Sequence, residues 1–571
     1  MEGHQGKLDR EFDAVLLNAR DHCIQVKHHG KRDVQGVCIL LDKSSTWPSS
    51  MKLEDYPGIE PETSHISWLP PASFLRSIRQ LRPRKKALLF YQGDRVGDEG
   101  YLRGRGRLAI LLLGRAGAKG LVDGEGRAVY LADGQLLAMT MATIIEGILA
   151  AIASAVLVPA TVLFVGTLAY LGRRREPPRR VDCPEKTRFA YLRTDLWSMT
   201  WGGAATHIRE FSRAVENLGA EVHIVTSQEV LGLEGVDQRI IPPPGRLAVL
   251  RDIQILAYNF TFTFRALEYI RGVGGVDVIY HRYGAFSWCG AMLSVLLNIP
   301  LVLEFNSSEV WWAKNLENEF LLRILKASER TVLACSDWIA TVSKVLNRDL
   351  ILTGVDEGRV FDNPNGVDPS LFPPVAAQEN RGGELVVGFT GVFAEHHGVE
   401  ILIEAFRRAE SGERDLKLLL VGGGRLADRV LALVREKNLE WHTKLTGMVP
   451  HGEVPEYLLS CDILVLPHPN MGDGSEFFGS PVKLFEYMVS GRAILSTSVG
   501  QMGRILKHGS TALLVEPGDL EGMAEGILEL AGNPPLRRKM GKQARKLALQ
   551  RYTWEENARR VLSRICRGKA E

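Results

Sequence analysis

The stretch Gly479-Ser-Pro-Val-Lys-Leu-Phe-Glu-Tyr-Met-Val-Ser-Gly491 decides how the rest of the chain is interpreted. An apolar run at 463–466 precedes it, and a second run at 493–497 follows; each predicts a buried strand. Pro481 is tolerated in the first turn of a helix, where its missing N–H would have no helical partner. Gly491 is typical of a helix end. The sequence therefore predicts a strand, a loop, a helix beginning near Pro481 and another strand.

The polar residues of this unit lie at the predicted helix start. A helix N-terminus offers free N–H groups and the positive end of the helix dipole, which suit a phosphate. Lys483 adds a cation in the first turn, and Glu486 lies on the same face one turn later. A cation for phosphates and a carboxylate for vicinal hydroxyls would together recognise a nucleotide. The alternative is a surface helix on which both charges are solvated.

The segment resembles the donor site of family-4 glycosyltransferases, enzymes of the GT-B architecture. It is most similar to bacterial members that carry Ser-Pro-x-Lys-Leu-Phe-Glu-Tyr-Met, and the resemblance extends over about residues 187–563. In many members a first glutamate stands eight positions before the second, but Phe478 occupies that place here. The resemblance implies a donor-binding set of Gly479, Ser480, Pro481, Lys483 and Glu486. Lys483 is also a catalytic candidate, because it is the remaining cation of the motif that could meet the charge on the leaving diphosphate.

Composition bounds the class of protein. The chain has 571 residues, which predicts two to four domains, and its 70 basic and 67 acidic residues are too balanced for a nucleic-acid binder. Seven cysteines without paired spacing argue against a disulfide framework and a zinc site, and fit a reducing compartment. The polar N-terminus predicts that no cleavable signal peptide is present.

An N-terminal extension, residues 1–137, precedes a predicted membrane segment with a basic flank, residues 138–175. The extension is either a small α/β piece or its remnant, with strands at 37–41 and 87–91 and a helix at 74–81. Residues 147–171 carry no charge over 25 positions, and about 20 suffice to span a bilayer.

Five arginines follow the uncharged run, between residues 173 and 180, which places the C-terminal domains in the cytoplasm by the positive-inside rule. A single pass would require the extension to cross the membrane without a signal peptide. The alternative is a monotopic segment that keeps both sides cytoplasmic. In either case we expect a chain that begins near Lys186 to be soluble.

The next domain, residues 186–375, opens with a strand, a glycine-bearing loop and a helix at 205–217. The loop resembles the one that borders the donor phosphates in family-4 enzymes, which implies donor-binding roles for Gly202 and Gly203. Polar residues also follow a strand at 277–280, where open α/β sheets bind ligands. In relatives a polar residue at this place faces the sugar, and we assign His281 and Arg282 to it as catalytic candidates. The alternative for each is a structural side chain.

Residues 384–550 form the predicted donor-side domain, and strands alternate with helices throughout. The Pro-Asn-Gly-Val-Asp segment at 364–368 resembles a family hallmark at the end of the first domain. In the tail, residues 551–571, a helix at 554–565 resembles the one that crosses back to the first domain in GT-B enzymes. We therefore expect an α/β fold with two Rossmann-like doubly wound domains facing a cleft.

The predicted phosphate site departs from the family. Many members place an Arg and a Lys in the loop after the first strand of the second domain, where this chain has Val392 and His397. Gly391 and His397 complete the predicted donor set, and His397 is partly charged at neutral pH. No Asp-x-Asp motif lies near a strand end, so no metal is implied. No cofactor is expected beyond the nucleoside-diphosphate sugar as co-substrate.

The resemblance implies a membrane-anchored transferase that moves a sugar from a nucleoside-diphosphate sugar to a lipid-linked or envelope-glycan acceptor with retention of configuration. Two alternatives stay open. The missing glutamate and cations are compatible with a non-catalytic nucleotide-sugar-binding homologue. Another GT-B enzyme, such as a sugar-nucleotide epimerase, would share the same donor site.

Overall fold

The computed structural model describes residues 133–172 and 179–566, except 182–186, 197–202, 234, 245–250, 316–320, 374–383, 411–414 and 425, together with seven short strands before residue 131. The chain divides into two compact units. The first comprises Met1–Val158 and Pro244–Gln254, and the second comprises Pro159–Pro243 and Ile255–Glu571. Both predicted Rossmann-like domains lie in the second unit, apart from Pro244–Gln254 of the first domain.

The N-terminal extension contains a seven-stranded sheet in the order β4-β2-β1-β3-β5-β6-β7. Its strands are β1 (Phe12–Asn18), β2 (His22–His28), β3 (Gln35–Leu41), β4 (Ile59–Glu62), β5 (Leu88–Gln92), β6 (Ala118–Val122) and β7 (Ala128–Tyr130). Strands β1, β3, β5 and β6 pair in parallel. The predicted strands at 37–41 and 87–91 are confirmed as β3 and β5, and the predicted helix at 74–81 lies outside the described residues.

Helix α3 (Asp133–Gly172) contains the uncharged run and is 40 residues long. Its portion Ile144–Gly172 is long and apolar enough to cross a membrane. Its last turns, from Pro159 onward, belong to the second unit. There Val165 and Leu168 are buried in the core of the first Rossmann-like domain.

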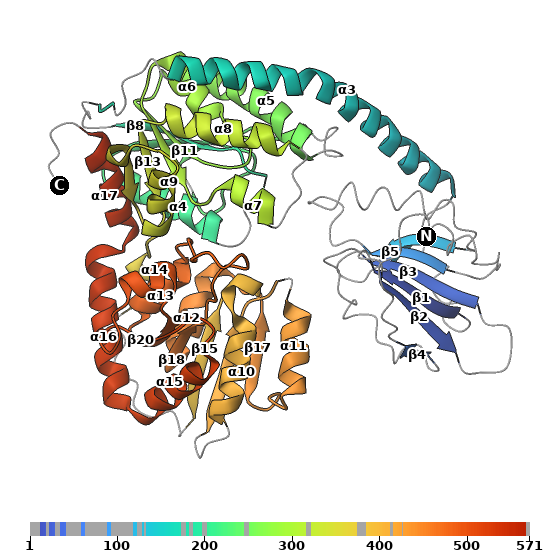
Figure 1. Ribbon diagram of the computed structural model, residues 1–571, viewed down its shortest axis with the longest axis vertical. Helices are drawn as coiled ribbons and strands as arrows, with labels where there is room; N and C mark the ends of the chain where they lie inside the picture. Colours follow the sequence, from blue (N-terminus) through green and yellow to red (C-terminus); the bar gives the residue numbers. More distant parts are fainter. Residues whose placement is uncertain are drawn as a thin grey trace. The chain divides into compact units, whose positions relative to one another are not determined.

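The first Rossmann-like domain has a parallel sheet in the order β10-β9-β8-β11-β12-β13-β14. The strands are β8 (Arg188–Arg193), β9 (Glu221–Thr226), β10 (Asp237–Ile240), β11 (Val278–Arg282), β12 (Leu301–Phe305), β13 (Trp338–Thr341) and β14 (Val360–Asp362). The helices are α4 (Gly203–Asn217), α5 (Arg251–Gly272), α6 (Cys289–Leu297), α7 (Glu309–Asn315), α8 (Leu322–Cys335) and α9 (Lys344–Leu352). The central strands are mainly apolar because helices bury both faces of the sheet (Figure 1), and their charged residues lie near the strand ends.

The second Rossmann-like domain repeats this plan in the order β17-β16-β15-β18-β19-β20. The strands are β15 (Leu385–Thr390), β16 (Leu416–Val421), β17 (Thr443–Gly447), β18 (Ile463–Leu466), β19 (Ala493–Thr497) and β20 (Leu513–Val515). The helices are α10 (Val399–Glu410), α11 (Ala427–Glu436), α12 (Val454–Ser460), α13 (Val482–Ser490), α14 (Gly500–Ile505), α15 (Leu520–Gly532) and α16 (Pro534–Arg551). The predicted α/β fold of two doubly wound domains is therefore confirmed.

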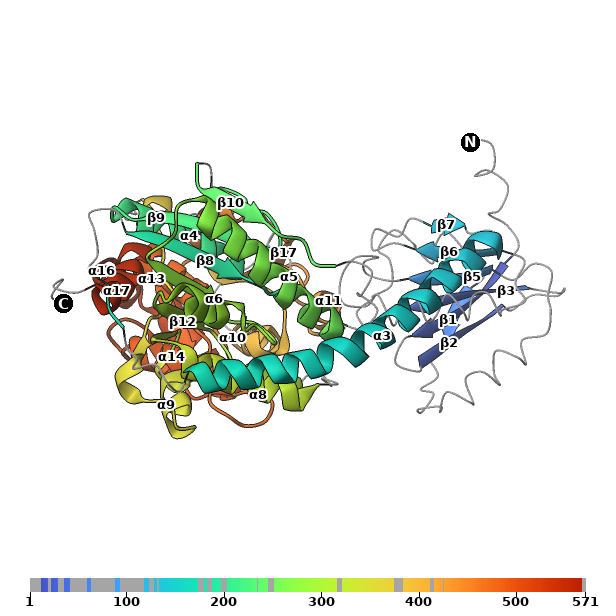
Figure 2. The ribbon, with the colours of Figure 1, turned by 90° about the horizontal axis from the view of Figure 1, so that it is seen from above.

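The C-terminal helix α17 (Trp554–Ile565) returns to the first domain (Figures 1 and 2). It packs against α4, and Trp554 and Ile565 are buried in the core with Phe211. Gly366 allows the start of α17 to pass close to the first domain, because a Cβ at that position would lie 2.6 Å from the backbone nitrogen of Trp554. Cys566, at the end of α17, is disulfide-bonded, a single bond that the spacing of the cysteines did not predict. Spacing along the chain could not show which cysteines meet in space.

Candidate active site

Lys483 lies in the first turn of α13, directly beneath Gly391 of the loop after β15. The sequence did not show that these two residues meet. The ammonium nitrogen of Lys483 is 4.3 Å from the centre of the Phe389 ring. A Cβ at Gly391 would lie 2.6 Å from that nitrogen and would displace the end of the lysine, and the φ of +130° at Gly391 also favours glycine. Lys483 is buried, and Nζ has no hydrogen-bond partner among the described residues. An unpaired buried amine is costly, so this position favours an anionic ligand.

Burial lowers the pKa of Lys483 to about 7, although the nearby Glu486 carboxylate opposes the shift. The amine is therefore charged for only part of the time at neutral pH. A phosphate beside it would favour the charged form.

Two histidines lie beside Lys483. Nδ1 of His397 is 2.6 Å from the backbone oxygen of Val392, and the His397 ring lies 5.3 Å from the ring of His468. Burial, followed by the charge of Lys483, lowers the pKa of both histidines. The surroundings of His397 therefore do not raise its pKa, and burial favours the neutral ring.

His468 is a residue that the sequence analysis missed. It is fully buried, and neither of its ring nitrogens has a partner within the described part of the chain. It follows β18 by two positions, so its place after a strand end was a usable signal. Together with the unpaired nitrogen of Lys483, it supplies buried polar atoms without a hydrogen-bond partner in the described ranges.

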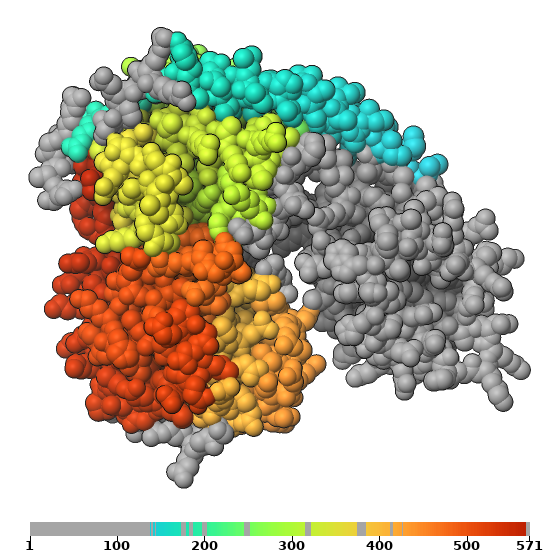
Figure 3. Space-filling view, viewed as in Figure 1, coloured from blue at the N-terminus to red at the C-terminus, as the bar shows by residue number. Residues whose placement is uncertain are grey.

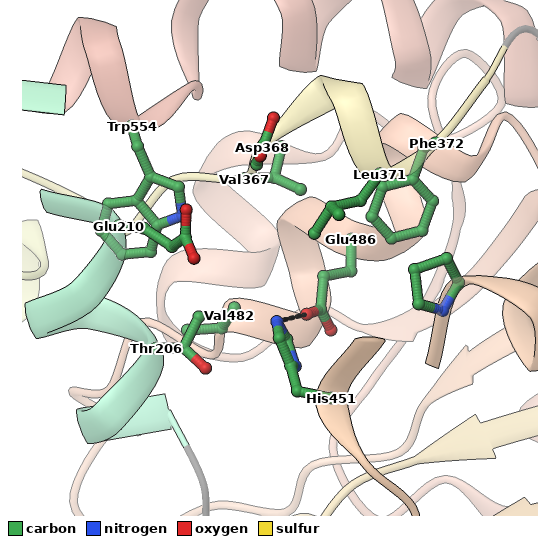
Figure 4. Close-up of a pocket in the computed structure, with 11 residues that line it drawn as sticks. Thr206, Glu210, Val367, Asp368, Leu371, Phe372, His451, Val482, Glu486 and Trp554 are labelled. Carbon is green, nitrogen blue, oxygen red and sulfur yellow. Dashed lines mark ion pairs between the residues drawn. The ribbon is translucent and has the colours of Figure 1, made fainter. Parts of the chain in front are cut away.

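Glu486 lines a pocket between the two Rossmann-like domains (Figure 4). Its carboxylate faces His451, with 3.8 Å between Oε1 and Nε2. Burial raises the pKa of Glu486 to about 7, against the opposing charge of Lys483. The pocket is lined by Thr206, Glu210, Val367, Asp368, Leu371, Phe372, His451, Pro455, Val482, Glu486 and Trp554. It holds about 10 Å³, which is room for one water molecule, so a nucleoside would have to move side chains or part the domains.

The loop before α13 is fixed to the first domain by hydrogen bonds. The backbone N–H of Asn365 donates to Ser480 Oγ at 3.1 Å, and Asn365 Nδ2 donates to the Ser480 carbonyl at 2.6 Å. Nδ1 of His207, on α4, lies 2.7 Å from Asn365 Oδ1. The Pro-Asn-Gly-Val-Asp segment therefore joins α4 to the start of the donor helix. In this structure Ser480 makes these structural contacts.

Gly479 and Pro481 shape the same loop. A Cβ at Gly479 would lie 2.6 Å from the Phe477 ring, so the loop needs glycine there. Pro481 precedes the first helical residue with φ −65°, the value to which its ring confines it. The predicted helix start is thereby confirmed.

A buried carboxylate, Glu304 at the end of β12, organises the first domain's side of the site. It accepts from Tyr191 Oη at 2.7 Å and Asn306 Nδ2 at 2.6 Å, and His207 Nε2 lies 3.2 Å away. Arg282 also donates to it. Burial alone would raise the pKa of Glu304, but His207 and Arg282 outweigh burial and hold that pKa well below its usual range. The sequence analysis missed Glu304 because it lies inside an apolar strand.

The structure separates the two catalytic candidates of the first domain. Arg282 joins the Glu304 cluster, and its Nε is 4.0 Å from Asp195. His281 is fully buried, with Nε2 2.8 Å from Ser287 Oγ, and burial lowers its pKa to about 3. His281 therefore does not reach the cleft in this structure, because its side chain points into the core from the opposite face of β11.

The glycine loop lies partly outside the described residues. Gly202 falls in the undescribed stretch, and Gly203 is the first residue of α4. A Cβ at Gly203 would be 3.5 Å from Val482 Cγ2, so the start of α4 lies close to the start of the donor helix.

Phe478, in place of the first family glutamate, packs among aromatic rings. Its ring centre is 5.2 Å from Trp311 and 6.1 Å from Trp312, both on α7. The same loop contributes Asp473, which accepts from Trp311 Nε1 at 2.9 Å, and Glu476, which is paired with Arg348 at 3.2 Å. The two loop carboxylates thus hold the loop against the first domain.

Comparison with known proteins identifies both domains. Residues 201–371 match the family described as Glycosyltransferase Family 4, and residues 375–547 match Glycosyl transferases group 1. An uncharacterized glycosyltransferase of Methanocaldococcus jannaschii is 27% identical over 62% of this chain and 92% of its own length. A D-inositol 3-phosphate glycosyltransferase of Pseudarthrobacter chlorophenolicus is 24% identical over 62% of this chain and 88% of its own.

Solved structures share the fold. Sucrose-phosphate synthase from Thermosynechococcus elongatus superposes with a TM-score of 0.52 at 20% identity, covering 66% of this chain and 97% of that protein. The Anabaena protein HepE, solved in complex with UDP, has a TM-score of 0.51 at 16% identity, covering 66% and 98%.

Proposed function

We propose that this chain, a glycosyltransferase of the group 1 type with the two Rossmann-like domains of the GT-B architecture, transfers a sugar from a nucleoside-diphosphate sugar. The proposed acceptor is lipid-linked or an envelope glycan. We further propose that the transfer retains the anomeric configuration and that the enzyme is associated with a membrane. HepE, which has the same fold, was solved with UDP and with UDP-glucose.

The observation that carries the proposal is the buried, unpartnered ammonium of Lys483 beneath Gly391. In the reaction the bond between the sugar C1 and the diphosphate oxygen breaks, and its electron pair stays on that oxygen. The acceptor oxygen bonds to C1, and its proton leaves with the nucleoside diphosphate. Lys483 and the backbone N–H groups at the start of α13 would meet the charge that develops on the diphosphate.

Glu486 would bind the ribose, since it lies one turn further along α13 and lines the interdomain pocket. On the acceptor side, Arg282 is the candidate cation, because Glu304 and Asp195 hold it at the end of β11. Electrostatic stabilisation and positioning would then carry the catalysis without a covalent step on a protein side chain.

The experiment is a screen of nucleotides by thermal shift, followed by turnover of the corresponding sugar donors with the full-length chain in membranes. A ligand at 100 times its dissociation constant stabilises the folded state by about 2.7 kcal/mol, which such a screen detects. Release of nucleoside diphosphate that depends on membrane lipids would support transfer to a lipid-linked acceptor. Nucleotide binding without any donor turnover would contradict transfer.

Nucleotide binding without donor turnover would favour a non-catalytic nucleotide-sugar-binding homologue. Two departures from the family at the donor site are compatible with that alternative. Val392 is exposed where many relatives have a cation, and Phe478 is packed among tryptophans where they have a glutamate. Conversion of the donor sugar itself in the absence of acceptor would instead indicate an epimerase.

A further inference from the structure

The last turns of α3 form part of the core of the first Rossmann-like domain. Thr161, Val165 and Leu168 are buried and recur at positions i, i+4 and i+7, which places them on one face of the helix. Phe164 adds to this contact, with its ring centre 4.4 Å from Trp288 and 5.3 Å from Phe260. Residues from Pro159 onward are therefore held by the domain and are not a free membrane anchor.

Polar contacts fix the end of α3 and the segment after it. The Cys335 thiol donates to the Leu168 carbonyl at 3.6 Å, and a Cβ at Gly172 would lie 2.4 Å from Cys335 Sγ. Beyond the helix, Arg179 pairs with Asp337 at 2.7 Å. Arg180 lies over the Trp338 ring at 5.6 Å. Two of the five arginines in the predicted membrane flank, Arg179 and Arg180, therefore make structural contacts within the first domain.

The length of the uncharged run then argues against a crossing. With residues 159–172 held by the domain, only 147–158 remain of that run, and 12 residues of α-helix extend about 18 Å. The hydrocarbon core of a bilayer is about 30 Å thick. Extending the span toward the N-terminus would place Glu146 within the bilayer, where a carboxylate is unfavourable.

The face of α3 that points away from the domain is nevertheless apolar. Within the second unit, Leu163 is 74% exposed, and Val162 and Tyr170 are exposed as well. On the neighbouring helix α5, Phe264 is 69% exposed and lies one turn from Phe260, which touches Phe164. A surface helix of a soluble protein would present polar residues outward. Figure 3 shows the C-terminal end of α3, in teal, against the first domain.

We propose that this outer face, formed by Val162, Leu163 and Tyr170 of α3 with Phe264 of α5, lies flat on a lipid bilayer, so that α3 is parallel to the membrane and does not cross it. An ordinary interfacial helix turns a charged face toward water. In α3 that second face is instead packed against the domain. Tyr170 is of a residue type enriched at the membrane interface. The sequence continues with Arg173, Arg174 and Arg175, which anionic headgroups attract.

This inference rests on the proposed membrane association and specifies its geometry: both flanks of α3 stay on the same side of the membrane. The test uses the full chain with an epitope tag at each end, in membrane vesicles whose cytoplasmic face is outward. We expect an added protease to remove both tags without detergent. Survival of the N-terminal tag until detergent is added would show a crossing and overturn the proposal.

A matched pair of variants tests the docking face itself. Leu163 on α3 and Leu352 on α9 are exposed to similar extents, 74% and 77%. Leu163→Asp should increase the fraction of protein released from anionic phospholipid vesicles at least tenfold, whereas Leu352→Asp should not. Equal release of both variants would overturn the proposal.

A second copy of the chain is the competing occupant of this face. Light scattering in the absence of lipid tests it: a dimer that Leu163→Asp dissociates would also overturn the proposal. Donor turnover, measured on the same proteins in detergent, reports on sugar transfer independently of membrane binding. The docking geometry and the proposed function can therefore fail separately.

Discussion

Replacement of Lys483 by Met tests the assignment of the phosphate site most directly. The substitution keeps a long flexible side chain beneath Gly391 and removes the charge. Because burial lowers the pKa of Lys483 from 10.5 to about 7, the folded state binds fewer protons than the unfolded state between these values. The free energy of unfolding therefore rises with pH across this window, and at neutral pH the lysine is destabilising.

Each unit by which burial lowers the pKa of Lys483 costs about 1.4 kcal/mol of folding free energy. At neutral pH the buried lysine therefore destabilises the folded state by on the order of 4 kcal/mol. This cost already includes the opposing charge of Glu486, and the contact of Lys483 with the Phe389 ring returns part of it. We expect the free Lys483→Met protein to be at least as thermostable as the parent. Its turnover should nevertheless fall on the order of a hundred- to a thousandfold, the effect of removing one donor to a developing oxyanion.

The assay measures the melting temperature, the nucleoside-diphosphate affinity and turnover in the same preparations. In the parent, affinity should decrease as pH rises through about 7, because the bound diphosphate requires the protonated amine. The variant should lack this dependence. Lys539→Met, a change at an exposed lysine of α16, is the control and should match the parent in all three measurements. Turnover of Lys483→Met within a fewfold of the parent would refute the assignment.

Three further predictions concern the nucleoside, the core and the membrane. Glu486→Gln should weaken nucleotide binding ten- to a hundredfold, since a hydrogen bond to a charged group contributes about 1.5–3 kcal/mol; unchanged affinity by calorimetry would make the residue structural. A chain beginning at Lys186 was expected to be soluble, but it lacks Phe164, Val165 and Leu168 of the core. In the same detergent it should melt below a chain beginning at Pro159, because each fully buried side chain contributes about 1.5–3 kcal/mol; equal melting temperatures would contradict this. The full-length chain should stay with membranes after a carbonate wash, and recovery in the soluble fraction would count against association.

Local patterns predicted the elements around the site. The strands at 463–466 and 493–497 and the helix at 554–565 have the predicted bounds, and α13 begins one residue after Pro481. These elements are short apolar runs or amphipathic segments bounded by proline, glycine or a capping residue. Such signals act within a few residues of the chain, so the sequence alone carries them.

The site residues were predicted where a motif marked them. Lys483, Glu486 and Gly391 do come together, as the family resemblance implied. The resemblance could not show that Lys483 is buried without a partner. Nor could it show that the environment holds His397 neutral, since pKa shifts depend on the groups that surround a side chain.

Tertiary structure alone decided the remaining features. Glu304 reaches His207, and Asn365 reaches Ser480, across distances of about a hundred residues in sequence. His281 and Arg282 are adjacent in β11, yet one enters the core and the other joins a charged cluster, because successive side chains of a strand point to opposite faces. The uncharged run of α3 identified an apolar helix from sequence. The buried face of α3 is set by the domain that packs against Val165 and Leu168. The composition of the helix does not show which face that is.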